Sequence, residues 1–383
     1  MQNLTAYGVI IFVFMLLCGM FLLPGTVHAQ DENNKEKKRE NVFLHPKKFY
    51  KKYFPRLKIK SDPPDSAYIK MYPNYLSVSA YVLSPEIGMD FGPGNTHANG
   101  ALKLRTSIGD ILGFSANYRL VGAGFAFLLN SGASSQDVYA KSRYRTATIK
   151  YNSKSTSLQF KYLRIKGLTD IALPAGTDPS TGYIKRPDIE SKEFQFEALY
   201  NPRWKKYSYI APLTFSQRQI KSSTGFLLQT GIYYSRLSSD STLVGPEKAE
   251  YYGNFKNVKV VKSFSIRLAP GLGSNFVFFK RYYLSVVAFP SYDLSFYKYL
   301  HDEDEKEKGK HAFVFVLEGK ASLGYHSERL YGGLRIEAER RSASLHEIGM
   351  NSRYVYLGVE FGYRFNTPRI VKKVYRETMP PGM

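Results

Sequence analysis

In the stretch Tyr354-Val-Tyr-Leu-Gly-Val-Glu-Phe-Gly-Tyr-Arg-Phe365, the side chains alternate between two sets with a period of two. One face of the expected strand carries Val355, Leu357, Val359, Phe361, Tyr363 and Phe365, and the other carries Tyr354, Tyr356, Gly358, Glu360, Gly362 and Arg364. Successive side chains of a strand point to opposite faces, so one side is apolar and the other polar. A tilted strand of about 10 such residues, with aromatic side chains at one end, is long enough to span a membrane. The stretch therefore predicts the closing strand of a transmembrane β-barrel.

The composition favours the same fold class. The chain has 383 residues, 43% of them hydrophobic, with 31 Tyr and 26 Phe against one Trp. An excess of Tyr and Phe is typical of the aromatic girdles of a transmembrane barrel. The mean hydropathy of -0.32 argues against helical membrane spans.

The only long apolar run, residues 9–23, lies at the N-terminus and is too short for a spanning helix. It is followed by Val27-His28-Ala29, a small-x-small motif that predicts cleavage of a signal peptide after Ala29. Cleavage removes Cys18, the only cysteine, so the exported chain has neither a disulfide nor a cysteine-based metal site. Export through a cleaved signal peptide predicts an outer-membrane location.

The formal net charge of +22 favours acidic partners. We expect these partners to be outer-membrane lipids and the phosphates of lipopolysaccharide. Residues 31–60 carry eleven Lys or Arg against four Asp or Glu. This segment is either a disordered linker or a basic, aromatic segment that contacts a periplasmic partner. Nucleic acid is excluded as a partner by export of the chain.

From Tyr75 onward the chain is a series of alternating segments. We predict strands at about 75–90, 101–118, 121–129, 143–151, 156–166, 191–201, 224–236, 256–269, 281–297, 311–325, 329–341 and 351–365. Long connections alternate with short ones, as extracellular loops alternate with periplasmic turns. The sequence therefore predicts an all-β, antiparallel transmembrane barrel of about twelve strands with both termini in the periplasm. The segment 202–223 does not fit the rhythm, and fourteen strands are the alternative.

These patterns divide the chain into four parts. We predict a signal peptide at 1–29, a basic periplasmic lead at 30–66 that is disordered, a barrel at 67–365 and a basic C-terminal tail at 366–383.

Charge predicts which face of each strand points into the barrel. An Arg or Lys on the lipid face costs about 2–4 kcal/mol at the membrane midplane, so the charged faces point inward. The last three strands then bring together a lumenal charge network of Glu318, Lys320, Arg335, Glu337, Glu339, Arg341, Glu360 and Arg364. Because both signs are balanced, we expect ion pairs that fill a narrow barrel. The alternatives are a polar channel lining and a proton-handling site between Glu337 and Glu360.

No phosphate loop, dinucleotide motif, zinc motif or calcium loop is present, so the sequence predicts no cofactor and no metal. The acidic run 302–307 lacks the ligand spacing of a calcium loop. Only His326 and His346 lie close to both Ser and Glu. We expect the first in a tight turn and the second in a loop, without the Ser–His arrangement of a lipid hydrolase. We therefore predict no catalytic residue and a non-enzymatic narrow pore, or a barrel that binds a ligand or partner. The alternative is a hydrolase that modifies lipid or lipopolysaccharide.

A series of short motifs goes beyond composition. In chain order these are Arg186-Pro-Asp188, Tyr200-Asn201, Lys206-Tyr-Ser-Tyr209, Gln217-Arg-Gln-Ile-Lys-Ser-Ser-Thr-Gly-Phe226, Asp240-Ser-Thr-Leu243 and Ala269-Pro-Gly-Leu-Gly-Ser-Asn275. The series resembles a domain-of-unknown-function family of predicted Gram-negative outer-membrane barrels over about 65–365. The resemblance implies fold and location, but neither an activity nor a ligand. The aromatic end of the final strand also resembles the signal read by the barrel-assembly machinery, which is therefore an expected partner.

The densest polar block of the expected barrel lies in the segment that the strand rhythm does not place. It consists of Gln217, Arg218, Gln219 and Lys221. We hypothesise that this block occupies the lumen or its rim.

Overall fold

The computed structural model describes residues 63–93, 100–131, 138–172, 183–301, 308–345 and 348–378. The predicted signal peptide, nearly all of the predicted basic lead, the acidic run 302–307 and His346 lie outside the described residues. Residues 63–366 form one compact unit that contains the barrel. The predicted tail belongs to a separate unit and contains the helix α4 (Arg369–Thr378). None of the helices that the structure describes is both long enough and apolar enough to cross a membrane.

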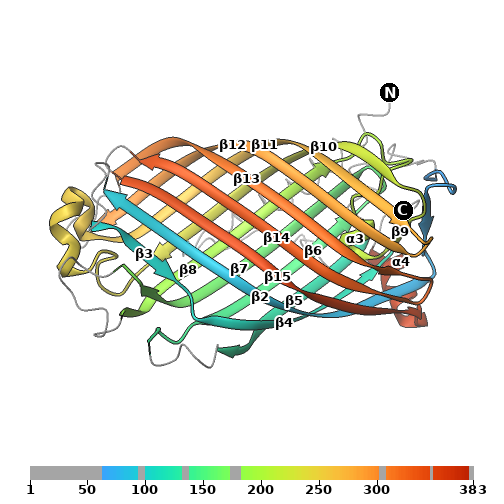
Figure 1. The fold of residues 1–383 in the computed structure, drawn as a ribbon, viewed down its shortest axis with the longest axis horizontal. Coiled ribbons are helices and arrows are strands. Elements are labelled where there is room, and N and C mark those ends of the chain that lie inside the picture. Colours follow the sequence, from blue (N-terminus) through green and yellow to red (C-terminus); the bar gives the residue numbers. More distant parts are fainter. Residues whose placement is uncertain are drawn as a thin grey trace, which may run out of the picture. The chain divides into compact units, whose positions relative to one another are not determined.

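The barrel wall is a closed antiparallel sheet of tilted strands (Figure 1). Its strands are β2 (Tyr75–Pro93), β4 (Ile108–Tyr118), β5 (Val121–Ser131), β6 (Arg143–Asn152), β7 (Thr156–Asp170), β8 (Ile184–Tyr200), β10 (Ser223–Ser238), β11 (Val258–Phe278), β12 (Tyr282–His301), β13 (Lys308–His326), β14 (Leu330–Leu345) and β15 (Ile348–Asn366). Each strand pairs with the next, and β15 pairs with β2 along its whole length, from Ile348 opposite Pro93 to Asn366 opposite Tyr75. Within the described residues the wall thus has the twelve strands predicted, and the alternative of fourteen is wrong.

The two ends of the barrel differ in their connections. At the turn end, the connections 119–120, 153–155, 279–281 and 327–329 are short, and 201–222 is the longest. At the loop end, the strands are joined through 94–107, 132–142, 171–183, 239–257, 302–307 and 346–347. β2 begins and β15 ends at the turn end, so the chain enters and leaves the wall on the same side.

Three predicted segments differ most from the structure, and one of them is the predicted strand 191–201, because β8 begins seven residues earlier, at Ile184. The predicted strand 101–118 is interrupted at Thr106 and Ser107 and forms two elements, β3 (Leu102–Arg105) and β4. β3 pairs with β2 on one side and with β7 on the other, so it crosses above the shorter strands β4 to β6. The predicted connection 270–280 is mostly strand, because β11 continues through Pro270 to Phe278. Pro270 is exposed on the outer face of the wall.

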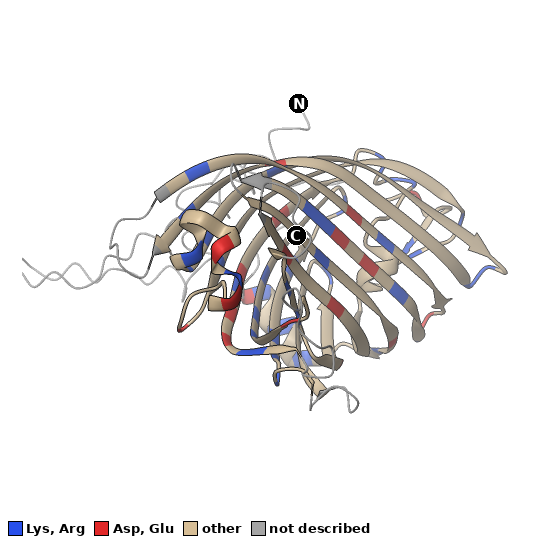
Figure 2. Ribbon diagram, turned by 60° about the vertical axis from the view of Figure 1, so that its left-hand side comes forward, with Lys and Arg blue, Asp and Glu red and all other residues tan. Residues whose placement is uncertain are grey.

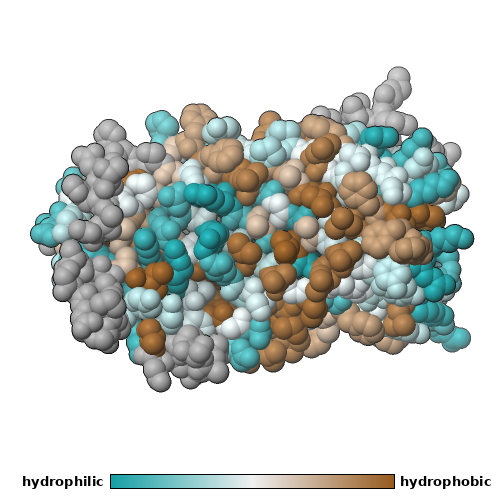
Figure 3. Space-filling model, viewed as in Figure 1, coloured by the Kyte–Doolittle hydropathy of each residue, from teal (hydrophilic) through white to brown (hydrophobic). Residues whose placement is uncertain are grey.

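The outer face of the wall carries many exposed hydrophobic side chains. Among them are Leu268, Leu272, Phe313, Val359 and Phe361, each at least half exposed. On the face shown in Figure 3, hydrophobic side chains form a band across the middle of the barrel, with hydrophilic side chains on both sides. A band of this kind is what the hydrocarbon layer of a membrane requires of a barrel wall.

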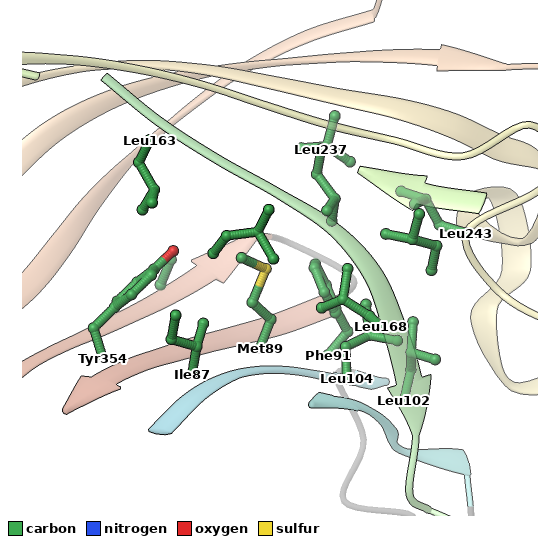
Figure 4. Packing of buried hydrophobic residues seen from close by; sticks show 14 of the residues in the cluster. Ile87, Met89, Phe91, Leu102, Leu104, Leu163, Leu168, Leu237, Leu243 and Tyr354 are labelled. Carbon is green, nitrogen blue, oxygen red and sulfur yellow. The ribbon is translucent and has the colours of Figure 1, made fainter. Parts of the chain in front are cut away.

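At the loop end the lumen is filled by a large apolar cluster (Figure 4). Its members include Ile87, Met89 and Phe91 of β2, and Leu102 and Leu104 of β3. The 3-10 helix η3 (Pro246–Asn257) adds Tyr252 and Phe255 from the connection between β10 and β11. The lumen-facing side chains of the wall are therefore apolar at this end, whereas the rule that charged faces point inward predicted polar ones. Burial in a filled lumen, which excludes water as a protein core does, stabilises these apolar side chains and explains the exception.

Candidate functional site

The centre of the lumen is organised by Arg267 of β11, which is 1% exposed. Its Nε and Nη2 atoms each donate a hydrogen bond of 2.9 Å to the carboxylate of Asp293 on β12. Its Nη1 atom lies 3.1 Å from Glu318 and 3.4 Å from Glu339. The guanidinium also lies 4.3 Å from the ring centre of Tyr233, close enough for a cation–π contact. A buried guanidinium needs this many acceptors to offset its lost hydration.

Part of the predicted charge network lies next to Arg267, through Glu318 and Glu339. Figure 2 shows that acidic and basic positions lie close together on neighbouring strands of the wall. Lys320 is 2.8 Å from Glu318, and Arg341 is 2.5 Å from Glu339. The structure thus brings these four predicted residues together in the lumen.

Arg335 joins the two carboxylates that were considered as a proton-handling pair. Its guanidinium lies 2.6 Å from Glu337 and 3.2 Å from Glu360. Each carboxylate therefore has a cation as its partner, and the two do not form an acid pair with each other.

Arg364 does not join the network, and its predicted place there is wrong. It lies at the turn end, where it contacts the imidazole of His326 and donates to the carbonyl oxygens of Phe215 at 2.6 Å and Ser327 at 2.8 Å. Arg364 shares a face of β15 with Glu360, but it lies four residues further along the strand, closer to the turn end than the charge network is. It stacks there on Tyr72 at 4.0 Å.

The predicted network omitted six of the lumenal charges, although the rule that charged faces point inward already applies to the strand faces of Lys161, Glu193, Glu197 and Arg267. Arg267, Asp293, Glu193, Glu197, Lys150 and Lys161 all belong to the lumen face, because they line its cavities or contact Arg267. The period-two pattern contained the signal: Asp293 lies between Ser291 and Ser295 on one face, and Lys150 follows Thr146 and Thr148. The prediction assembled a network from the last three strands only.

The segment 201–222 enters the lumen at the turn end and forms a plug with residues 63–74. It contains the short helix α3 (Ala211–Thr214) and β9 (Gln217–Gln219), which pairs with β1 (Ile69–Met71). The segment was hard to place as a wall strand because it folds inside the wall. Proline is tolerated in the first turn of a helix, and Pro212 occupies that position in α3.

Gln219 holds the plug together. Its Nε2 atom donates to the carbonyl oxygens of Lys206 at 2.7 Å and Lys221 at 2.9 Å, and its Oε1 atom accepts from the Ser208 amide at 2.9 Å. Asn275 of β11 donates to the Ser208 carbonyl oxygen at 2.8 Å, which ties the plug to the wall.

The other members of the polar block lie differently. Gln217 is buried and accepts from the Ser208 hydroxyl at 2.7 Å. Arg218 donates to the His326 carbonyl oxygen at 3.4 Å, and Lys221 lies over the ring of Tyr68. The two glutamines therefore hold the plug, whereas Lys221 is exposed at its edge.

Two glycines in the wall make room for the plug. Gly225 of β10 and Gly273 of β11 are directly paired, and the ring of Tyr207 lies against both. A Cβ atom on Gly225 would lie 2.5 Å from the Tyr207 ring, and one on Gly273 would lie 1.9 Å from its hydroxyl oxygen. Tyr207 is fully buried in this slot, and burial raises the pKa of its hydroxyl.

The motifs of the family resemblance meet in two places. Asn201, Tyr207, Gln219 and Asn275 all belong to the contacts that fix the plug. At the loop end Arg186 donates to Asp188 at 2.9 Å and to the carbonyl oxygens of Thr242 at 2.7 Å and Leu243 at 2.9 Å. These motifs thus fix how the lumen is filled at both ends.

A polar cavity of about 150 Å³ remains in the lumen beside the plug. It extends along β4 to β7, from Asn117 and Asn152 near the turn end to Tyr144 and Tyr356, which belong to the apolar cluster. Its charged lining consists of Lys150, Lys161, Glu197, Lys320, Arg335, Glu337 and Glu360.

Two of these cations differ from the rest. Glu337 and Glu360 bind Arg335, and Lys320 binds Glu318. Lys150 forms no hydrogen bond or ion pair with any residue that the structure describes, and Lys161 has a cation–π contact with Tyr356 at 5.7 Å and is attracted electrostatically by Glu337 and Glu197. Two ammonium groups therefore face the cavity with donors to spare.

Tyr209 of the plug forms part of the cavity wall and lies 3.4 Å from the Lys320 ammonium. Burial raises the pKa of the Tyr209 hydroxyl to about 12, although the Lys320 charge opposes this shift. The hydroxyl thus stays protonated and can donate a hydrogen bond into the cavity.

The environment of His326 does not support hydrolysis. The imidazole is buried against Phe215 at 5.4 Å and Tyr331 at 6.2 Å, and its Nε2 atom contacts Arg364. No serine hydroxyl bonds to it among the described residues, so a Ser–His pair is not formed there. The same residues contain no cluster of three or more His, Cys, Asp or Glu that could hold a metal ion.

Residues 63–365 match the family described as Domain of unknown function (DUF4421). The chain belongs to this family. The match covers the whole barrel and its plug, so the DUF4421 domain begins just before β1 and ends at the last residues of β15. The comparison with curated proteins finds no match.

Several solved outer-membrane barrels are similar to this DUF4421 chain. The outer membrane protease OmpT from Escherichia coli is 10% identical, with a TM-score of 0.35, and the alignment covers 77% of this chain and 98% of that one. The translocator domain of the autotransporter NalP from Neisseria meningitidis is 15% identical, with a TM-score of 0.36 and coverages of 76% and 88%. An outer membrane channel from Pseudomonas putida F1 is 9% identical, with a TM-score of 0.32 and coverages of 80% and 100%. Similarity at this level bears on neither activity nor substrate.

Proposed function

We propose that the chain is an integral outer-membrane barrel that binds a small anionic solute in its central cavity and forms no open pore. Membrane insertion is supported by the closed wall and its apolar outer band. Because both ends of the wall segment lie at the turn end, we assign the turn end to the periplasm and the loop end to the cell exterior.

The observation that carries the proposed ligand class is the pair of ammonium groups in the cavity. Lys150 and Lys161 line it together with the hydroxyls of Thr146, Thr148 and Ser115. A buried ammonium group that forms no direct ion pair is unfavourable, and a bound carboxylate or phosphate would supply that ion pair. The volume of about 150 Å³ limits the solute to a small molecule.

The filled ends of the lumen argue against passive conduction. A solute that crossed the barrel would have to pass the apolar cluster around Met89, Phe91 and Leu104 at the loop end. Apolar constrictions of this kind exclude water and ions. The cavity reaches the turn-end residues Asn117 and Asn152, so we propose that the solute enters from the periplasm.

The test is calorimetric titration of the refolded barrel with succinate, citrate and inorganic phosphate, with putrescine as the cationic control. We expect one of the anions to bind and putrescine not to bind. The variant Lys150→Met with Lys161→Met is expected to weaken binding by about thirtyfold or more, since losing a partner of a buried charge pair costs roughly 2–5 kcal/mol. The matched control is Lys221→Met with Lys280→Met, which removes two exposed cations outside the cavity.

Binding that both double variants retain would refute the assignment of the site, and preference for putrescine would refute the ligand class. Conductance in planar bilayers tests the proposal that the barrel forms no open pore. We expect a closed baseline, and a steady open-pore current would overturn the closed lumen.

A further inference from the structure

The turn between β11 and β12, residues 279–281, has a strained backbone. Phe279 and Lys280 both have positive φ angles, of 47° and 61°. Such angles are uncommon outside glycine, and a bulky residue such as phenylalanine rarely adopts them. Strained residues of this kind cluster at functional sites, where the strain persists because the surrounding structure requires it. The two residues therefore indicate a role for this turn beyond the connection of two strands.

The turn presents an aromatic side chain to the surroundings of the barrel. Phe279 is 85% exposed, which is unfavourable for an apolar ring in water. Its ring centre lies 6.0 Å from that of Phe278 and 6.4 Å from that of Tyr282. The ring of Tyr282 in turn lies 5.3 Å from that of Tyr325 on β13. We define these four residues as the turn aromatic cluster.

The turn aromatic cluster lies on the outer face of the wall. Tyr283 is buried in the lumen, with its ring centre 6.3 Å from that of Phe215 of the plug, so its neighbour Tyr282 points outward. The next outward-facing residues on the two strands, Phe276 and Leu284, are 50% and 38% exposed. The apolar outer face of β11 and β12 therefore continues up to the turn.

This continuity places the turn at the surface of the membrane. The hydrocarbon layer covers the apolar band of a barrel wall, and aromatic residues mark the level of the lipid head groups at its edges. A turn that directly follows the apolar face thus lies among the head groups, where the Phe279 ring is removed from water by contact with lipid.

Two cations adjoin the turn aromatic cluster. Arg281 donates a hydrogen bond of 3.1 Å to the Tyr325 hydroxyl, which holds its guanidinium beside the rings, and four of its five N–H donors remain. Glu328, which Arg281 attracts electrostatically, forms its ion pair with Lys70. Lys280 is exposed and forms no hydrogen bond or ion pair with any residue that the structure describes. The two cations therefore have donors for an anion at the membrane surface.

We propose that the β11–β12 turn is a binding site for an anionic phospholipid of the leaflet at the turn end. The lipid phosphate accepts charge-assisted hydrogen bonds from Arg281 and Lys280. The Phe279 ring packs against the acyl chains together with the rest of the turn aromatic cluster. A lipid fits this site better than a soluble partner, because the cluster is continuous with the face that the membrane covers. The inference rests on the proposed membrane insertion and is independent of the solute cavity.

The test measures the binding of phosphatidylglycerol to the full-length barrel in micelles of a neutral detergent, by native mass spectrometry. Lys280→Gln with Arg281→Gln is expected to weaken binding about 25-fold, since each basic residue near an anionic surface contributes roughly a factor of five. The matched control is Lys206→Gln with Lys221→Gln, which removes two exposed cations that lie over Tyr68 of the plug. We expect the control to bind the lipid as tightly as the native barrel does.

A second variant tests the aromatic part of the site. Asparagine adopts positive φ more readily than phenylalanine, so Phe279→Asn removes the ring and relieves the strain of the turn. We expect this variant to fold, as read from its gel mobility, and to bind phosphatidylglycerol about tenfold more weakly, because the ring no longer contacts the lipid. Binding at the native affinity would overturn the role of Phe279.

Three further outcomes would overturn the proposal. Equal losses in the Lys280 and Arg281 variant and in its control would mean a general charge effect. Diacylglycerol, which lacks the phosphate, would bind as tightly as phosphatidylglycerol if phosphate were not recognised. Glycerol phosphate, which lacks the acyl chains, would do so if the site held a soluble anion.

Two separate measurements keep this result distinct from the proposed function. Flotation of the refolded barrel with lipid vesicles reads membrane insertion. Titration of the cavity with succinate, citrate and phosphate is repeated in both turn variants, where we expect it to be unchanged. Loss of anion binding there together with lipid binding would mean that the turn variants disturb the whole barrel, which would overturn the assignment of a local lipid site.

Discussion

Arg267 and Asp293 lie directly opposite each other on β11 and β12, and each side chain is 1% exposed. Two parallel hydrogen bonds of 2.9 Å join the guanidinium to the carboxylate. Because the same guanidinium also reaches Glu318 on β13 and Glu339 on β14, it links four neighbouring strands. The charge network of the lumen therefore belongs to the structure of the wall.

The first prediction concerns that pair. Asp293→Ala leaves the buried guanidinium without its bidentate partner, and we expect the free energy of unfolding to fall by about 3–5 kcal/mol. Urea unfolding of the barrel in lipid vesicles measures the change. The control is Glu86→Ala, which breaks the ion pair with Arg353 on the outer face, where the two side chains are 58% and 53% exposed. An exposed pair contributes about 1 kcal/mol or less, so equal losses in the two variants would contradict this role.

The closing strand shows how far a local pattern reaches. Its period-two alternation correctly predicted that Val359 and Phe361 face outward and that Tyr354 and Glu360 face the lumen. The alternation along each strand and the rhythm of long and short connections were enough to predict the strands of the barrel wall, because both are local properties of the sequence. β3 could not be predicted in this way. Leu102 and Leu104 follow the same alternation as residues of the wall strands. The position of β3 across the loop end depends on its pairing with the distant strand β7, which the local sequence does not show.

The site was harder to predict for a different reason. The cost of a charged side chain on the outer face is largest at the middle of a membrane and falls to about 0–1 kcal/mol near its interfaces, so charged faces need to point inward only at the middle. On β7, Arg164 points outward while Leu163 and Ile165 fill the lumen, and Lys161 further along the same strand faces the cavity. Which rule applies depends on the height of a residue in the barrel, and this height is fixed by the register between strands rather than by the local sequence.

The second prediction concerns the slot that holds Tyr207. Gly225→Ala places a methyl group against the ring, which is fully buried and has no room to move away. Overpacking of this kind costs about 1–3 kcal/mol, and we expect the plug to loosen while the wall remains closed. Limited proteolysis at Arg203 and Lys205 measures this change.

The matched control for the slot is Gly349→Ala on β15, where a Cβ atom would meet nothing within 4 Å. Its cleavage rate should equal that of the native protein. If the Gly225 and Gly349 variants are cleaved equally slowly, the fit of Tyr207 against Gly225 does not fix the plug.

The third prediction separates two neighbours on β9. Gln219→Leu leaves the carbonyl oxygens of Lys206 and Lys221 and the amide of Ser208 without their side-chain partner. Since each buried unsatisfied group costs about 1–3 kcal/mol, the plug should become more accessible to protease. Arg218→Gln, the control, removes one long bond of 3.4 Å and should change little. Greater damage from the Arg218 change would show that the charge, rather than the amide, fixes the plug.

The last prediction concerns the loop end, where two adjacent tyrosines have different surroundings. The Tyr252 hydroxyl is buried, donates to the Phe91 carbonyl oxygen at 2.8 Å and accepts from the Leu102 amide at 2.8 Å. It thereby joins η3 to the ends of β2 and β3. Tyr252→Phe leaves both backbone groups unpaired inside the apolar cluster, at a cost of about 1–3 kcal/mol. We expect faster hydrogen exchange at the amides of β3, because the opening is local. Tyr251→Phe, one residue earlier, should leave that exchange unchanged, because the Tyr251 hydroxyl bonds to Glu250 outside the cluster. If both variants accelerate exchange equally, the closure of the loop end does not depend on the Tyr252 hydroxyl.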